Sequence, residues 1–176
     1  MVSAQSATPC SNLGFLSVFQ ESNGFLGGYL VTNAWGRPLE FRISTAVQPN
    51  KVQQILYGDT LDSYIAGEVI GKTLFEKSTT PVQLVVVDNR MCLDLRLRIE
   101  CPVALWYGAA TTAADMPGLL VQPKVFCHAQ FPQDIEGIRE RLEKLANVDL
   151  IEPFARIREA VHEARKLGVT TRNLAA

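Results

Sequence analysis

The stretch from Pro81 to Tyr107 reads PVQLVVVDNRMCLDLRLRIECPVALWY, and it decides the expected fold. Its first part, residues 82–87, is a nearly unbroken run of apolar and largely β-branched residues, which is typical of a strand buried on both faces. Asp88 and Asn89 then supply turn chemistry. We therefore expect the covered centre of a sheet here, with a turn directly after it.

The second part of the stretch, residues 92–100, alternates between polar and apolar positions. Leucine or isoleucine occupies every second position, and Asp94, Arg96 and Arg98 are among the residues between them. A period of two over this length predicts a half-buried strand with its apolar face inward. Residues 103–107 resume as another apolar segment. The stretch thus predicts two further strands beside the buried one.

The preceding part of the chain predicts a meander followed by helices. Asn23-Gly24 lies between two apolar runs, which is a strong hairpin signal. A second reversal is expected at residues 34–38, so residues 13–45 read as three antiparallel strands. Residues 51–77 show the apolar spacing of helices, with a break near Gly58. This helical segment is expected to cover one face of the sheet.

Two short amphipathic segments follow near the C-terminus, within residues 131–168. In each of them the apolar residues recur at steps of three and four, as on one face of a helix. Both segments are too short to be stable alone, so we expect them to form an antiparallel helical hairpin that packs on another surface. The candidate association face consists of Ile135, Ile138, Leu142, Phe154, Ile157 and Val161.

Together these patterns predict an α+β fold, with a mainly antiparallel sheet of five to six strands, a helical cover and a C-terminal helical hairpin. The order of elements over residues 13–107 resembles that of PAS, profilin-like and longin-type domains. This resemblance transfers no functional residue. The expected organisation is a flexible tail (1–12), the sheet domain (13–107), a linker or covering loop (108–130), the hairpin (131–168) and a tail (169–176).

Composition narrows the function classes. The 176 residues carry a net charge of −1, which argues against a general electrostatic attraction to nucleic acid or anionic membranes. No run of about 18 apolar residues exists, so no transmembrane helix or membrane partner is expected. The four cysteines show no Cys-x-x-Cys spacing and only two histidines accompany them, so neither a metal site nor a cofactor is expected. Free thiols favour a cytoplasmic location.

Few residues offer catalytic chemistry. Asp88, at the end of a buried strand, resembles the metal-holding acid of many nucleotide enzymes, but no phosphate-binding loop accompanies it. We therefore favour a turn role for it. Cys127 and His128 are adjacent, and adjacent side chains rarely point together, so a structural role is expected for both. His162 is expected to face solvent. No catalytic residue is assigned.

Two further groups of residues are candidates for contact or packing. The first is a candidate polar contact surface, formed by Arg37, Arg42, Asp94, Arg96 and Arg98. It would bind an acidic partner or a phosphate backbone. The alternative is that these charges pair across neighbouring strands. The second is a set of glycines at close-packing or pocket positions between the sheet and the helix expected at residues 59–75: Gly27, Gly28, Gly67 and Gly71.

The absence of a coherent catalytic set and the near-neutral charge favour a non-enzymatic cytoplasmic subunit or adaptor. It would act through protein–protein contacts of its sheet domain and helical hairpin, with a protein partner or as a homo-oligomer. One alternative is a ligand-sensing domain with a pocket between the sheet and the helix at 59–75. A further alternative is an accessory nucleic-acid-binding protein that uses the arginine residues.

Overall fold

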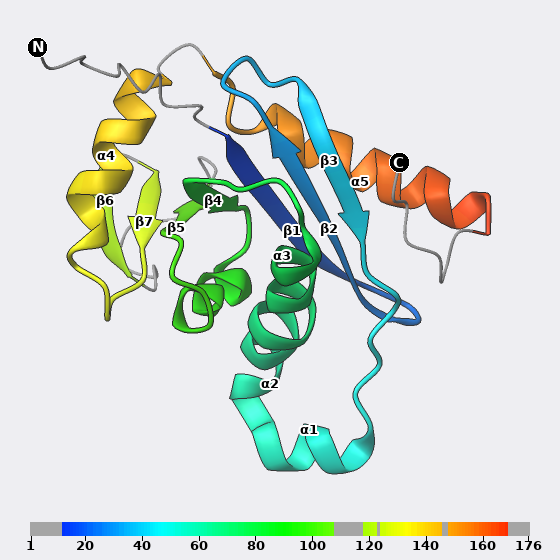
Figure 1. Ribbon diagram of the computed structural model, residues 1–176. Coiled ribbons are helices and arrows are strands. Elements are labelled where there is room, and N and C mark those ends of the chain that lie inside the picture. The colour runs from blue at the N-terminus through cyan, green and yellow to red at the C-terminus, as the bar shows by residue number, and fades with distance from the viewer. Residues whose placement is uncertain (1–11, 108–117, 123, 146–147, 169–176) are drawn as a thin grey trace, which may run out of the picture.

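The computed structural model describes residues 12–107, 118–122, 124–145 and 148–168. Within these ranges seven strands form one mixed sheet, in the order β3-β2-β1-β4-β5-β7-β6 (Figure 1). The strands are β1 (Leu13–Glu21), β2 (Gly24–Thr32), β3 (Pro38–Ile43), β4 (Leu84–Val87), β5 (Val103–Trp106), β6 (Leu119–Gln122) and β7 (Val125–Cys127).

The α+β class is confirmed, but the mainly antiparallel sheet of five to six strands was partly wrong. The neighbouring strands β1, β4 and β5 run parallel, and antiparallel pairs flank them on both sides. The two strands at one edge, β6 and β7, come from the segment that was expected to be a linker or covering loop. The remaining domain boundaries stay predictions.

Helices cover both faces of the sheet. One face carries α2 (Leu61–Ser63), the π-helical segment η2 (Tyr64–Lys72) and α3 (Thr73–Lys77). The opposite face carries α4 (Asp134–Lys144) and α5 (Glu152–Lys166). The short helix α1 (Lys51–Tyr57), followed by the turn η1 (Gly58–Thr60), stands away from the sheet and has no buried residue (Figure 1).

The expected hairpin and the buried central strand are confirmed. β1 and β2 pair antiparallel, with Glu21 opposite Gly24 at the turn. Gly24 has a φ of +118°, a conformation that glycine adopts without steric cost. All four residues of β4 are buried because β1 and β5 pair with its two edges and helical segments cover both faces.

The strand predicted over residues 92–100 was wrong. This segment is η3 (Arg90–Leu97), a 3-10 helix that lies over the sheet instead of in it. The physical reason is the parallel pairing of β4 with β5, because a connection between parallel strands has to cross a face of the sheet. Cys92, Leu93 and Leu95 point into the core, while Leu97 is exposed.

The antiparallel helical hairpin was also wrong as an arrangement, although both helices exist. α5 lies across β1 and β2, whereas α4 packs on β6 at the other end of the sheet (Figure 1). Each helix therefore buries its apolar face on a different part of the sheet. Ile138, Leu142, Phe154, Ile157 and Val161 are buried in one core with the strands, and Ile135 packs at its margin.

The predicted glycines lie where neighbouring elements approach closely. A Cβ atom on Gly27 would meet Ile70 Cγ2 at 2.3 Å, and one on Gly28 would meet Ile157 Cγ2 at 2.5 Å. On η2, a Cβ on Gly67 would lie 3.0 Å from the backbone nitrogen of Leu95, and Gly71 packs against Leu16. The space beside these glycines is thus filled by neighbouring side chains and backbone.

Replacing Gly27 by alanine is expected to lower the free energy of unfolding by about 1–3 kcal/mol, because the added methyl group overlaps Ile70 in a filled core. Urea denaturation followed by circular dichroism measures this. Gly137→Ala in α4 is the matched control. Its Cβ would meet only the flexible end of Arg141, and alanine favours a helix, so no loss is expected. Equal stability of the wild type and Gly27→Ala would contradict the packing argument.

Candidate functional site

At the carboxyl end of β4, beside the middle of β1, three polar side chains that are remote in sequence come together. Leu16 of β1 pairs with Val87 of β4, so the next residues along these parallel strands, Ser17 and Asp88, lie side by side. Helix α5 crosses the face of the sheet on which these two side chains lie, and it places Arg158 against them. In open α/β sheets ligands bind outside the carboxyl ends of parallel strands, which makes this cluster the candidate site.

One carboxylate oxygen organises the cluster. Asp88 Oδ2 accepts a hydrogen bond from Ser17 Oγ at 2.9 Å and one from Arg158 Nη2 at 2.6 Å. The other oxygen, Oδ1, is buried and has no hydrogen-bond partner among the described residues. The site therefore combines a buried hydroxyl, a largely buried carboxylate and a guanidinium whose side chain is 57% exposed.

Burial raises the pKa of Asp88 above its ordinary value, and the Arg158 guanidinium and the Ser17 hydroxyl act in the opposite direction. The stability of the ionised carboxylate in this buried position depends on the cation beside it, because water solvates the negative charge poorly there. Arg158 thus forms an ion pair with Asp88, and because the Arg158 side chain is exposed, its remaining N–H groups are available to a ligand.

Arginine and histidine side chains lie near the cluster. Arg90 is exposed and follows Asp88 by two positions. On α5, His162 and Arg165 follow Arg158 at spacings of four and seven, so the three lie along one side of the helix. Arg165 forms an ion pair with Glu21 at the end of β1. The α5 side of this sheet edge therefore presents a row of donor groups.

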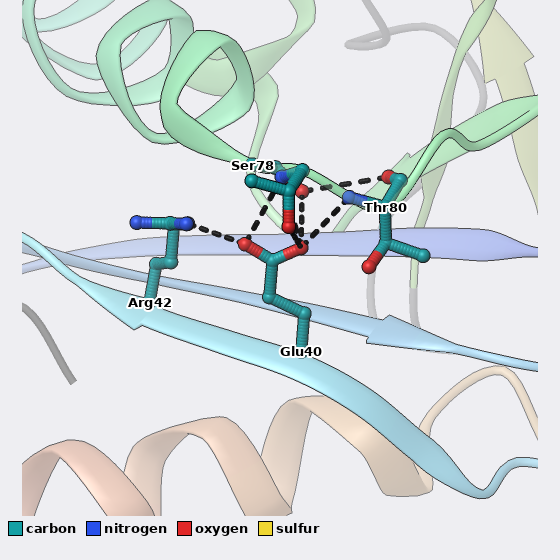
Figure 2. Close-up of polar contacts among 5 residues, drawn as sticks. Glu40, Arg42, Ser78 and Thr80 are labelled. Atoms are coloured by element: carbon teal, nitrogen blue, oxygen red, sulfur yellow. Dashed lines mark hydrogen bonds and ion pairs between the residues drawn. The ribbon is translucent and has the colours of Figure 1, made fainter. Parts of the chain in front are cut away.

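The residues of the predicted polar surface are dispersed over the molecule. Arg42 on β3 donates to Glu40 on the same strand, at 2.5 Å. The other partners of Glu40 belong to the loop before β4: Ser78 Oγ and the backbone N–H groups of Thr79 and Thr80 donate to its carboxylate (Figure 2). This cluster fastens the loop to the sheet.

The arginines of η3 have separate partners. Arg96 forms a buried ion pair with Asp134 at the start of α4, whereas Arg98 pairs with Glu68 on η2 at 3.0 Å. Because the segment is a 3-10 helix, these side chains do not share a strand face with Arg42. Arg37 lies in the turn before β3, where its backbone N–H donates to Asn33.

Asp94 and His128, which lie 34 positions apart in the sequence, meet in the fold. Asp94 of η3 contacts His128 Nε2 at 3.3 Å, and the backbone N–H of Gln130 donates to His128 Nδ1. Cys127 is buried within β7, next in sequence to that histidine. Among the described residues no group of three His, Cys, Asp or Glu side chains is placed to hold a metal ion.

Sequence reasoning considered Asp88 and set it aside as a turn residue, and it missed both of the side chains that contact it. The alternation within β1 contains Ser17 as a small polar residue, but its neighbour in space follows 71 positions later. The signal that could have found the cluster is the parallel pairing of β1 and β4, because it puts the residue after a buried strand beside a buried serine.

No family model and no curated protein matches the chain. Solved structures do show likeness of fold. One is an endonuclease V of Ciona intestinalis in complex with a 23-mer DNA containing an inosine followed by a ribo-adenosine: identity is 9%, the match covers 62% of this chain and 51% of that one, and the TM-score is 0.43. Another is the endonuclease V of Bacillus subtilis, with 8% identity, 58% and 46% coverage and a TM-score of 0.37.

The chain spans about half the length of these structures, and the likeness is one of fold alone. The matches, which are to endonucleases, run against the expectation of a non-enzymatic subunit or adaptor, and that expectation is not retained. The expected protein partner or homo-oligomer stays a prediction. None of the helices in the described ranges has the length and hydropathy of a membrane span.

Proposed function

We propose that the protein binds nucleic acid, and that the phosphate backbone lies at the carboxyl end of β4, against the Asp88 cluster. The observation that carries this proposal is the Asp88–Ser17–Arg158 cluster, in which a buried carboxylate fixes an exposed guanidinium at the carboxyl end of a central parallel strand, a position where ligands bind in open α/β sheets. An arginine held from one side can use its other N–H groups on a phosphate, often in bidentate geometry.

The surroundings of the cluster support a backbone contact over base recognition. Arg90 and His162 are exposed close in sequence to Asp88 and Arg158, respectively. Arginine side chains on a surface neutralise phosphates, and an imidazole N–H can donate a hydrogen bond to one. Because the net charge is −1, the electrostatic attraction for phosphate is local to this surface and does not extend over the whole molecule. We therefore expect modest affinity that falls steeply as salt rises.

Arg158→Gln is expected to weaken binding of mixed-sequence oligonucleotides by roughly three- to tenfold, with similar loss for each sequence. The slope of log affinity against log salt should fall by about one, because one phosphate contact is lost. Fluorescence anisotropy with labelled single-stranded DNA, single-stranded RNA and duplex DNA measures both quantities between low and physiological salt.

Arg98→Gln is the matched control. Arg98 is also an ion-paired arginine of similar exposure, 48% for its side chain, but it lies on η3 at the opposite face of the sheet. Its replacement should leave affinity and salt slope unchanged. Equal losses in the two variants, or no salt-dependent binding by the wild type, would refute the proposed site. The same oligonucleotides incubated with Mg²⁺ or Mn²⁺ and separated on a denaturing gel test for strand cleavage directly.

A further inference from the structure

A pocket of about 490 Å³ lies between the β2–β3 turn and the first turn of α5, away from the Asp88 cluster. Phe15 and Thr32 are fully buried, so they form its inner end. Trp35 of the turn and Pro153 and Arg156 of α5 also line it. This volume lies in the range of small-molecule sites, which are mostly apolar and carry a few polar groups.

The inner end of the pocket contains a hydroxyl group without a partner. Thr32 Oγ1 is buried and makes no hydrogen bond within the described part of the chain. A buried polar group in this condition costs about 1–3 kcal/mol, so its retention in a pocket needs an explanation. A ligand atom that accepts from or donates to this hydroxyl would satisfy it, because a hydroxyl can do either.

The mouth of the pocket presents an aromatic surface on a fixed turn. The Trp35 side chain is 89% exposed, although its backbone is well held. Asn33 Oδ1 accepts from the backbone N–H of Trp35 and of Arg37, each at 3.0 Å. Arg156 Nη1 donates to the carbonyl of Gly36 at 3.0 Å and so ties the turn to α5. The turn therefore fixes the backbone that carries the indole ring, and stacking has to order only the two side-chain torsions of Trp35.

The charges around the pocket argue against an anionic ligand. Two carboxylates, Asp149 and Glu152, line it together with one guanidinium, that of Arg156. Glu152 already pairs with this arginine at 2.9 Å, and Asp149 Oδ1 accepts from the backbone N–H of Ile151. No unpaired cation remains among the described lining residues to hold a phosphate, so an uncharged ligand fits best.

We propose that this pocket binds a neutral planar heteroaromatic ring of nucleobase or nucleoside size, stacked on Trp35 and hydrogen-bonded to Thr32. Stacking on an indole tolerates every base, while the single hydroxyl selects rings that carry a matching donor or acceptor at the buried edge. This inference rests on the pocket alone and holds whether or not the Asp88 cluster contacts phosphate.

Equilibrium dialysis with adenosine, guanosine, cytidine and uridine tests the proposal on the full chain. We expect saturable binding of at least one nucleoside, and weaker binding of its 5′-monophosphate. Thr32→Val should reduce affinity about fivefold, the loss of one hydrogen bond, without lowering the stability, because it removes an unpartnered buried hydroxyl. Trp35→Ala should reduce affinity roughly tenfold or more. Trp35 is exposed, so this change spares the core.

Tyr57→Ala is the control, since Tyr57 stacks on Tyr64 and lines a different pocket. It should bind the nucleoside as the wild type does. The proposal is overturned if no nucleoside binds saturably up to about 5 mM. It is also overturned if the monophosphate binds more tightly than the nucleoside, or if Thr32→Val and Trp35→Ala both retain wild-type affinity.

Discussion

Replacing Asp134 by alanine is expected to lower the free energy of unfolding by about 3–5 kcal/mol, because the change leaves a buried guanidinium without its counter-ion. The Arg96 and Asp134 side chains are only 12% and 7% exposed. Two nitrogen atoms of Arg96, Nε and Nη2, contact the two carboxylate oxygens at 2.7 and 3.3 Å. Urea denaturation monitored by circular dichroism gives the loss.

The remaining contacts of Arg96 explain why it cannot move to solvent after this change. Arg96 Nη1 donates to the carbonyl of Ile99 at 2.8 Å, and the guanidinium lies 3.9 Å from the centre of the Phe131 ring. These contacts hold the cation between η3 and the start of α4. Once the carboxylate is removed, nothing offsets the desolvation free energy of the cation fixed in that position.

Two comparisons make the result decisive. The double variant Arg96→Met, Asp134→Leu removes both charges and should recover most of the stability, because apolar pairs replace buried ion pairs at little cost. Glu136→Ala removes the carboxylate of an exposed ion pair on the same helix, with Arg139, and should cost less than about 1 kcal/mol. A loss for Asp134→Ala as small as that for Glu136→Ala would show that the buried pair is not structural.

Glu40→Gln is expected to destabilise the protein by about 1–3 kcal/mol at pH 7, because solvent screens part of the effect, and by much less in acid. Burial acts to raise the pKa of Glu40, but the N–H of Thr80, the Arg42 side chain and other donors outweigh it and lower the pKa to about 2, from an ordinary 4.5. A difference of this size corresponds to about 3 kcal/mol, and the side chain is only 12% exposed.

The sign of the pH dependence follows from the lowered pKa. The ionised carboxylate stabilises the folded state at every pH above about 4.5, and this contribution disappears as the pH falls toward 2. The difference in unfolding free energy between the wild type and Glu40→Gln should therefore be constant from pH 7 to 5 and shrink between pH 4.5 and 2. Urea denaturation at a series of pH values measures it.

Glu76→Gln provides the control for the carboxylate effect, since Glu76 is exposed and its nearest cation, Lys72, lies 3.9 Å away. It should change stability by less than about 0.5 kcal/mol at any of these pH values. If the difference between the wild type and Glu40→Gln kept its full size at pH 3, the hydrogen bonds shown in Figure 2 would not depend on the ionised form.

Local patterns predicted those elements whose partners are close in sequence. Asn23-Gly24 predicted the β1–β2 hairpin, and the apolar run before Asp88 predicted β4. The steps of three and four between apolar residues near the C-terminus predicted the two helices α4 and α5. Each of these signals depends on a turn, a cap or a period that a few adjacent residues contain.

The rest depended on contacts that no local pattern contains. The alternation of polar and apolar residues over 92–100 predicted a strand, but in η3 the polar side chains find partners from distant parts of the chain: Arg96 contacts Asp134, and Asp94 contacts His128. The direction of β5 relative to β4 determined that this segment leaves the sheet. The candidate site was missed for the same reason, since Ser17, Asp88 and Arg158 meet only after β1, β4 and α5 are in place.

The central position of β1 has a consequence for the order of folding. β1 finds one partner at once in β2, but its other edge waits for β4, and the Ser17–Asp88 bond between them closes a separation of 71 positions. Non-local parallel pairing of this kind slows folding, because chain entropy is lost before the contacts form. During synthesis, the emerging hairpin therefore exposes an apolar strand edge until the residues of β4 leave the ribosome, and in this interval the chain is most prone to aggregate.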